Sequence, residues 1–176
     1  NVAPAHLEGF GSVEGVAKAK GEIFRGLAPN GVAIVNAESP YLPLWQSEIG
    51  GRTLQSLNGG NYRAEKMVYS ESTVDFRLVS PIGEIEISMP YLGDHNVKNA
   101  LAAAALAINV GASLEDVRAG LAERIKVKGR LYPIQVNDGL LLLDDTYNAN
   151  VGSLKSAIDV LKNYPAKNGA DQNGAI

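Results

Sequence analysis

The stretch GVAIVNA, residues 31–37, is a short and nearly continuous apolar run, and it decides the fold class. A strand of this composition is typical of a parallel sheet, because helices cover both faces of such a sheet. The segment before it, residues 12–27, carries apolar side chains at helical spacing. A buried strand that follows an amphipathic helix predicts an α/β domain built around a parallel sheet.

The predicted helix over residues 12–27 has a signal at each end. Ser12 can cap its start, and Glu14 lies in the first turn, where the helix dipole favours negative charge. Gly26 and the turn at Pro29 can end it. We expect one buried stripe, made of Val13, Val16, Ala17, Ile23, Phe24 and Leu27.

A small antiparallel ribbon and two helices are expected in the middle of the chain. Residues 74–79 and 84–89 alternate polar and apolar side chains, and the residues between them predict a hairpin loop. The alanine-dense segment 96–109 predicts a helix. Residues 114–124 predict another, since Ser113 and Asp116 have the spacing of a capping box.

The basic stretch over residues 124–130 predicts a linker or a domain boundary. Beyond it, residues 131–136 and 140–143 predict a second hairpin, with an Asn-Asp-Gly turn between them. A helix is expected over about residues 153–163. The residues after Pro165 are too polar to bury much surface, and we expect them to be disordered.

The composition bounds the class of protein. The chain has 176 residues, 45% of them hydrophobic, which is enough for a globular core. Its net charge of −3 lacks the basic footprint of a nucleic-acid-binding protein. It contains no cysteine, which excludes disulfides and thiolate metal sites. No signal peptide opens the chain, and no apolar run approaches the about 18 residues of a membrane span. We therefore expect a soluble, cytoplasmic and monomeric protein.

Lys20 interrupts the apolar stripe of the first helix, one turn before Phe24. One interpretation is a snorkelling lysine, with its stem buried and its ammonium in water. The other is a poorly solvated lysine, whose neutral amine becomes available because desolvation disfavours the charged form. A neutral amine can add carbon dioxide to give a carbamate and a proton, and the carbamate is a carboxylate-like ligand for magnesium.

His6 and Glu8 belong to a polar opening segment, residues 1–11, which reads as a strand exit followed by a loop. Ligands of open α/β sheets bind beyond the carboxyl ends of the strands, so both side chains are candidate ligand contacts. The plainer interpretation of His6 is a loop histidine bonded to backbone. Imidazole is also a poor choice for magnesium, which prefers oxygen.

Asp94, His95, Asn96 and Asn99 surround the start of the helix predicted at residues 96–109. Capping by Asp94 or Asn96 would account for one of these polar residues. It does not account for the others. Asn99 offers both a donor and an acceptor, which suits the edge of an adenine base.

Asp144 and Asp145 end an apolar strand, where one acid could simply form a turn. Two acids followed by the polar side chains of Tyr147, Asn148 and Asn150 have the pattern of a rim that faces a ligand. Arg130 alone is weak evidence of a site, since most arginines are solvated. The sequence contains no G-x-x-x-x-G-K-[ST] phosphate loop.

Taken in order, these segments resemble the Mur ligase family, the ATP-dependent enzymes that build the peptide of bacterial peptidoglycan. The matching stretches are NVAPAHLEGFGS (1–12), AKAKGEIF (17–24), VNAESPY (35–41), GDHNVKNALAA (93–103), KGR (128–130) and DDTYNAN (144–150). The first and last of them favour the member that adds D-alanyl-D-alanine to UDP-N-acetylmuramoyl-tripeptide.

The resemblance implies a metal-binding and catalytic pair. Lys20 corresponds to a lysine that is carbamylated in several family members, where the carbamate binds magnesium. His6 corresponds to a histidine that binds a second magnesium ion, with Glu8 beside it. Lys20 and His6 are therefore the implied catalytic residues, and Mg2+ is an implied cofactor.

The resemblance also implies an ATP site. Asn99 corresponds to the asparagine that reads adenine, and His95 and Asn96 belong to the same motif. Arg130 corresponds to an arginine that contacts nucleotide phosphates, and Asp145 to the aspartate on the ATP ribose. The loop that closes over the site would contain Tyr147, Asn148 and Asn150.

Several parts of the family pattern have no counterpart in this sequence, among them the UDP-sugar domain, the phosphate loop and most of the C-terminal sheet.

Residues 1–129 would be the C-terminal part of the central ATP-binding domain, residues 130–164 the start of the C-terminal α/β domain, and residues 165–176 a tail. The chain is thus expected to be an inactive fragment. Two alternatives stay open: a sister ligase, either another Mur enzyme or a folylpolyglutamate synthase, or a non-catalytic α/β domain whose polar loops only cap helices.

Overall fold

The computed structural model describes residue 2 and residues 7–70, 73–91, 93–123, 127–137, 140–147 and 151–162. The chain divides into two compact units, Asn1–Glu123 and Arg124–Ile176. The basic stretch at residues 124–130 opens the second unit. Within the described ranges, no helix is both long enough and apolar enough to span a membrane.

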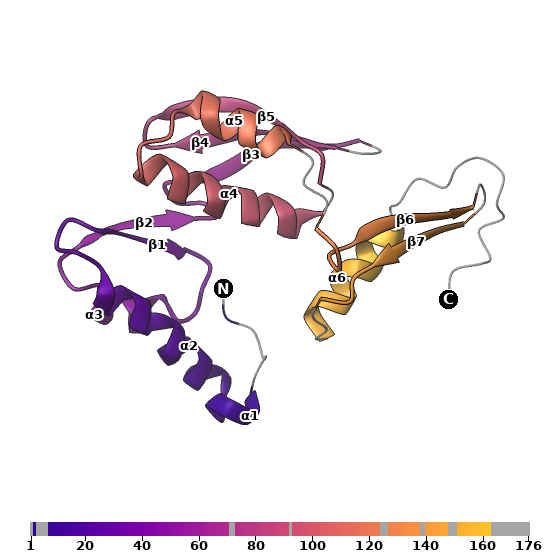
Figure 1. The fold of residues 1–176 in the computed structure, drawn as a ribbon. Helices are drawn as coiled ribbons and strands as arrows, with labels where there is room; N and C mark the ends of the chain where they lie inside the picture. The colour runs from indigo at the N-terminus through magenta and orange to yellow at the C-terminus, as the bar shows by residue number, and fades with distance from the viewer. Residues whose placement is uncertain are drawn as a thin grey trace. The chain divides into compact units, whose positions relative to one another are not determined.

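The first unit contains a two-stranded parallel sheet with helices on both sides (Figure 1). β1 (Val32–Asn36) pairs with β2 (Thr53–Leu57). One side of the sheet packs against the helices that precede and join these strands, and the other side packs against α4. The predicted α/β class is confirmed. The helices on the sheet are the 3-10 helix η1 (Glu22–Gly26), α3 (Leu42–Ile49) and α4 (Asp94–Asn109). α1 (Leu7–Phe10) precedes α2 (Val13–Gly21), which packs against η1 and α3.

The expected burial of β1 on both faces is only half correct. Ala33 and Val35 are buried against η1 and α3, whereas Val32, Ile34 and Asn36 are only partly buried. Ile34 packs against the core cluster to which α4 contributes, but a cavity lies beside it. The face of β1 toward α4 is therefore incompletely filled.

The helix predicted over residues 12–27 is an α-helix only as far as Gly21 and then tightens into η1. The Ser12 cap is confirmed, since its hydroxyl accepts a hydrogen bond from the Gly15 amide at 3.0 Å. The predicted burial of Ile23 is wrong, because this side chain is 71% exposed. A 3-10 turn has three residues rather than 3.6, so Ile23 rotates away from the sheet while Phe24 stays buried.

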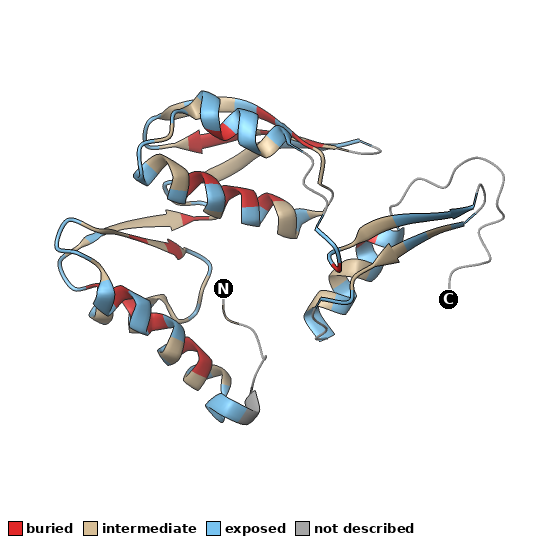
Figure 2. Ribbon diagram, in the orientation of Figure 1, coloured by how far each residue is buried: buried red, intermediate tan, exposed pale blue. Residues whose placement is uncertain are grey.

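The rest of the first unit is a three-stranded antiparallel sheet in the order β3-β4-β5, packed against α4 and α5 (Leu114–Ala122). The strands are β3 (Arg63–Tyr69), β4 (Val74–Ser80) and β5 (Gly83–Met89). The predicted β4–β5 hairpin is confirmed, with Val74 opposite Met89. Figure 2 shows the buried and exposed sides of α4, whose buried side consists of Val97, Ala100, Leu101, Ala104 and Ala105.

Both helices predicted after this sheet are present. α4 begins two residues earlier than expected, at Asp94. The capping box of α5 is confirmed: the Ser113 hydroxyl accepts from the Asp116 amide at 3.1 Å, and the Asp116 carboxylate accepts from the Ser113 amide at 2.9 Å. The Ser113 hydroxyl and amide lower the pKa of Asp116. α1, α3, β2 and β3 were not among the elements predicted from the sequence.

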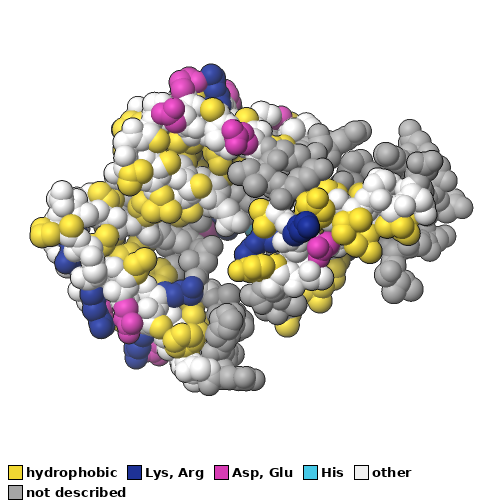
Figure 3. All heavy atoms as spheres, viewed as in Figure 1, with side chains coloured by type: hydrophobic (Ala, Val, Ile, Leu, Met, Phe, Trp, Pro, Cys, Tyr) yellow, Lys and Arg dark blue, Asp and Glu magenta, His cyan; other side chains and the backbone are white. Residues whose placement is uncertain are grey.

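The second unit contains the predicted hairpin and helix. β6 (Tyr132–Asn137) pairs antiparallel with β7 (Leu140–Asp144), and α6 (Val151–Lys162) follows. Several large apolar side chains of this unit are exposed, and Figure 3 shows hydrophobic side chains on its surface. They include Ile134, Val136, Leu140, Leu142, Val151, Leu154, Ile158 and Leu161. The expected disorder after Pro165 lies outside the described residues.

Candidate functional site

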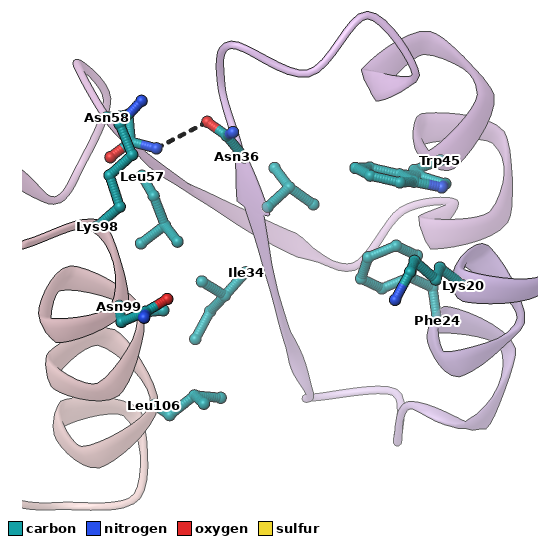
Figure 4. A pocket seen from close by; sticks show the side chains of 12 residues that line it. Lys20, Phe24, Ile34, Asn36, Trp45, Leu57, Asn58, Lys98, Asn99 and Leu106 are labelled. Carbon is teal, nitrogen blue, oxygen red and sulfur yellow. Dashed lines mark hydrogen bonds between the residues drawn. The ribbon is translucent and has the colours of Figure 1, made fainter. Parts of the chain in front are cut away.

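A cavity of about 240 Å³ lies at the carboxyl ends of the two parallel strands (Figure 4). Asn36 ends β1 and Asn58 directly follows β2, so both amides lie at the same edge of the sheet. This edge is where open α/β sheets bind their ligands. The lining residues are Lys20, Phe24, Ile34, Val35, Asn36, Trp45, Leu57, Asn58, Lys98, Asn99, Ala102 and Leu106.

Two residues predicted as parts of a site, Lys20 and Asn99, line this one cavity. Lys20 comes from α2 and Asn99 from α4, on opposite sides of β1 in Figure 4. Both residues are exposed. The fold therefore brings together two side chains that are far apart in the sequence.

The exposure of Lys20 bears on its two interpretations. The buried side of α2 is formed by Val16, Ala17 and Gly21, and Lys20 lies next to that line rather than in it. Its side chain lines a cavity that also contains Phe24 and Trp45. The exposed side chain fits the snorkelling interpretation, and the carbamate on Lys20 stays a prediction.

A polar network on the rim of the cavity was not found by sequence reasoning. The Asn36 side-chain oxygen accepts from the Asn58 amide group at 2.9 Å and from the Glu38 backbone amide at 3.0 Å. Lys98 of α4 forms an ion pair with Glu38 at 3.1 Å. The loop after β1 is therefore tied to β2 and to α4. The sequence contains the same pattern that pointed to Asp144, because Asn36 is also a polar residue at the end of an apolar strand.

The N-terminus of α4 is stabilised by other contacts than the predicted side-chain cap. Its N-cap is Gly93, with a φ of 95° and no side-chain cap hydrogen bond, so neither Asp94 nor Asn96 occupies the cap position. Asp94 accepts a hydrogen bond from the Tyr69 hydroxyl at the end of β3. His95 and Asn96 lie on this first turn and are partly buried. The predicted adenine-reading motif thus begins at a turn that is anchored to the antiparallel sheet.

The Tyr69–Asp94 contact predicts a measurable titration. Desolvation and the Asp94 carboxylate raise the pKa of Tyr69 from 10.0 to about 12. The folded chain therefore holds this proton more tightly than the unfolded chain, so the contribution of Tyr69 to stability is complete below pH 10 and is lost as the pH rises toward 12. Absorbance titration of the wild type minus Tyr69→Phe should isolate one late-titrating tyrosine. A difference curve centred near 10 would contradict the assignment.

In the second unit, the structure brings Arg130, Asp145 and Tyr147 together. Asp145 accepts from the Leu131 amide at 3.2 Å, and the Tyr147 amide donates to the Gly129 carbonyl at 3.0 Å. The Arg130 guanidinium carbon lies 4.3 Å from the centroid of the Tyr147 ring. These contacts join two segments that each contain a predicted site residue.

Asp144 adds to the same junction. Its carboxylate accepts from the Gly129 amide at 3.2 Å and from the Thr146 hydroxyl at 2.7 Å. The hydroxyl and amide of Thr146, followed by the Gly129 amide, lower the pKa of Asp144. Asp144 therefore forms the turn, which is the structural role that one of the two acids was expected to have.

The predicted metal ligands are largely outside what the structure describes. His6, Asn148 and Asn150 lie outside the described residues, and so does the side chain of Glu8. The opening segment was expected to be a loop, but its residues 7–10 form α1. Among the residues whose placement is described, no group of three or more His, Asp or Glu side chains could hold a metal ion.

Comparison with known proteins agrees with the family resemblance of the sequence. Residues 1–107 match the Mur ligase middle domain. The UDP-N-acetylmuramoyl-tripeptide–D-alanyl-D-alanine ligase of Haemophilus influenzae is 63% identical over 166 residues, which are 94% of this chain and 36% of that protein. The chain thus spans about a third of the length of this relative.

Solved structures match the same part of longer chains. A crystal structure of MurF from Acinetobacter baumannii matches with a TM-score of 0.86 and 38% identity, over 93% of this chain and 36% of that one. MurF from Thermotoga maritima, in complex with ADP, matches with a TM-score of 0.78 and 25% identity, over 95% of this chain and 39% of that one.

Proposed function

Because this chain belongs to the Mur ligase family, we propose that it is part of an ATP-dependent ligase that adds D-alanyl-D-alanine to UDP-N-acetylmuramoyl-tripeptide. The 63% identity to a ligase of that name supports this choice among the family members. The observation that carries it is the cavity at the carboxyl ends of β1 and β2, since Lys20 and Asn99 both line it. The reaction belongs to peptidoglycan synthesis in the cytoplasm.

The proposed reaction has two steps. The peptide carboxylate attacks the terminal phosphorus of ATP, which forms an acyl phosphate and releases ADP. The amine of D-alanyl-D-alanine then attacks the acyl carbon, the amide bond forms, and inorganic phosphate leaves with loss of the amine proton. Catalysis of such phosphoryl transfer depends mainly on positioning and on neutralising negative charge.

The nucleotide roles are proposed residue by residue. Asn99 would read the adenine edge, because its exposed amide can both donate and accept on the cavity wall. His95 and Asn96 would support it from the first turn of α4. Arg130 would contact the phosphates, and Asp145 the ribose. The loop of Tyr147, Asn148 and Asn150 is proposed to cover the site.

The proposed metal ligands are Lys20 as its carbamate, His6 and, more weakly, Glu8. Lys20 is exposed and lines the cavity, which leaves its amine accessible to carbon dioxide. A carbamate oxygen suits Mg2+, whereas the imidazole of His6 is a less favourable donor. When bound, magnesium would neutralise phosphate charge.

The proposal is tested by phosphate release and amide formation with a longer protein that contains this chain. D-alanyl-D-alanine and UDP-N-acetylmuramoyl-tripeptide should support turnover, whereas the substrates of the sister Mur ligases and of folylpolyglutamate synthase should not. A protein that shows turnover only with one of those other substrates would contradict the assignment. A protein with no turnover and no ATP binding would support a non-catalytic domain.

The 176-residue chain by itself is expected to show no ligase activity, because its sequence contains no phosphate loop to hold a triphosphate. The measurement is amide formation by the purified chain, with the longer protein as the positive control. Detectable product from the chain alone would show that the phosphate loop is not required.

A further inference from the structure

Arg130 lies in a tight turn of the second unit, and the residues on either side of it are hydrogen-bonded to two aspartates. The residues flanking it, Gly129 and Leu131, have φ angles of 76° and 48°. Leu131 is therefore in the left-handed region, which is unfavourable for a side chain of its kind. The Asp145 carboxylate accepts from the Leu131 amide, and the Asp144 carboxylate accepts from the Gly129 amide. The two acids thus stabilise the unusual backbone that presents Arg130.

Tyr147 contacts this turn through both its backbone amide and its ring. Its amide donates to the Gly129 carbonyl at 3.0 Å. The approach is so close that a Cβ at Gly129 would lie 2.9 Å from the Tyr147 nitrogen, which explains why glycine stands there. The Arg130 guanidinium lies over the ring, 4.3 Å from its centroid.

The geometry of this stack leaves Arg130 able to bind an anion. The five N–H donors of a guanidinium lie in its plane. Attraction of the cation to a ring face does not by itself occupy these donors in hydrogen bonds. Tyr147 is itself 67% exposed, so the stack lies at the surface of the unit rather than in its core. The ring would limit the motion of a long, exposed side chain while its donors stay available to an anion.

We propose that Tyr147 is a positioning residue for Arg130, and that its ring holds the guanidinium in the orientation in which it receives a nucleotide phosphate. This inference rests on the proposed function for the role of Arg130. It assigns to Tyr147 a task that depends on the aromatic ring and not on the hydroxyl group. Tyr147→Phe should therefore keep the orientation of Arg130, whereas Tyr147→Leu should lose it. The backbone bond from residue 147 to Gly129 is available to both variants.

The first test needs no enzymatic activity and uses the 176-residue chain itself. Protons of the Arg130 side chain that lie over an aromatic ring should show upfield ring-current shifts by NMR. The shifts should persist in Tyr147→Phe and disappear in Tyr147→Leu, while the amide resonances of the β6–β7 hairpin stay in place. Arg130 shifts that are unchanged in Tyr147→Leu would overturn the proposed stack.

The second test measures KM for ATP in the longer protein. Tyr147→Leu should raise KM by about two- to five-fold, the factor that corresponds to a cation–π contact at an exposed site, with a smaller change in kcat. Tyr147→Phe should raise KM less than Tyr147→Leu does, and Arg130→Ala should raise KM at least as much as Tyr147→Leu. If Arg130→Ala raises KM and Tyr147→Leu does not, the positioning role is overturned while the role of Arg130 stands. If Arg130→Ala has no effect, the proposed phosphate contact fails, and the positioning role fails with it.

Discussion

Lys20→Ala in the longer protein should lower kcat for amide formation by on the order of 10²-fold or more, the usual loss when one group that stabilises transition-state charge is removed. Lys20 lines the cavity at the carboxyl ends of β1 and β2, opposite Asn99. As a carbamate it would supply a fixed negative charge for a metal ion, and as an ammonium it would supply a positive one. Either charge would act at short range in the cavity.

The substitution Lys20→Arg separates the two chemical states. Arginine keeps the positive charge but cannot form the carbamate under the same conditions, so it should be as defective as alanine if the carbamate is the active form. A largely active Lys20→Arg variant would instead indicate an ammonium. Carbon-13 NMR of the wild type under labelled carbon dioxide would detect the carbamate directly.

Lys18 provides the matched control for Lys20. It lies on the same helix, two residues away, and forms an ion pair with Glu14 at 2.9 Å, but it does not line the cavity. Exposed pairs of this kind contribute little to stability. Lys18→Ala should therefore leave kcat unchanged. A loss as large as that of Lys20→Ala would indicate that the helix rather than the Lys20 side chain is responsible.

Trp45→Ala should reduce the free energy of unfolding of the first unit by about 3–5 kcal/mol, the range for removing a large aromatic side chain from a core. Trp45 is 4% exposed and lies 6.1 Å from Phe24 between ring centroids. Its indole N–H donates to the Ala17 carbonyl at 2.9 Å, which ties α3 to α2. The substitution removes both the packing and this bond. The effect should fall toward the lower end of the range, because Trp45 already borders a cavity.

The measurement for Trp45 is urea unfolding followed by far-UV circular dichroism, since Trp45 is the chain's single tryptophan and its fluorescence is lost with it. Ile23→Ala is the control: this side chain is exposed, so its loss should change stability by less than about 0.5 kcal/mol. Equal effects of the two substitutions would contradict the assignment of Trp45 to the core.

The elements that could be predicted are those encoded by short-range spacing. The Ser12 cap and the Ser113–Asp116 capping box each depend on residues three apart, and both are present. The β4–β5 hairpin follows from alternating side chains, and the β6–β7 hairpin from apolar runs around a local Asn-Asp-Gly turn. In these cases the partners of each interaction lie within one element or within one turn of the chain.

The elements that were missed depend on distant partners. β2, with the sequence TLQSL, has no clear apolar pattern, and its strand conformation comes with the parallel pairing to β1. α3 is stabilised by Trp45 and Ile49, which pack under that sheet. Ile23 was placed on the wrong side, because a change from α-helix to 3-10 helix shifts its direction.

The same distinction applies to the candidate site. The sequence by itself determined which residues carry the family resemblance, including Lys20, Asn99, Arg130 and Asp145. Only the tertiary structure decided that Lys20 and Asn99 line one cavity, that Asn36 and Asn58 join its rim, and that Arg130 stacks on Tyr147. The physical reason is that spacing along the chain sets side-chain direction only within an element, whereas contacts between elements depend on how strands pair and helices pack.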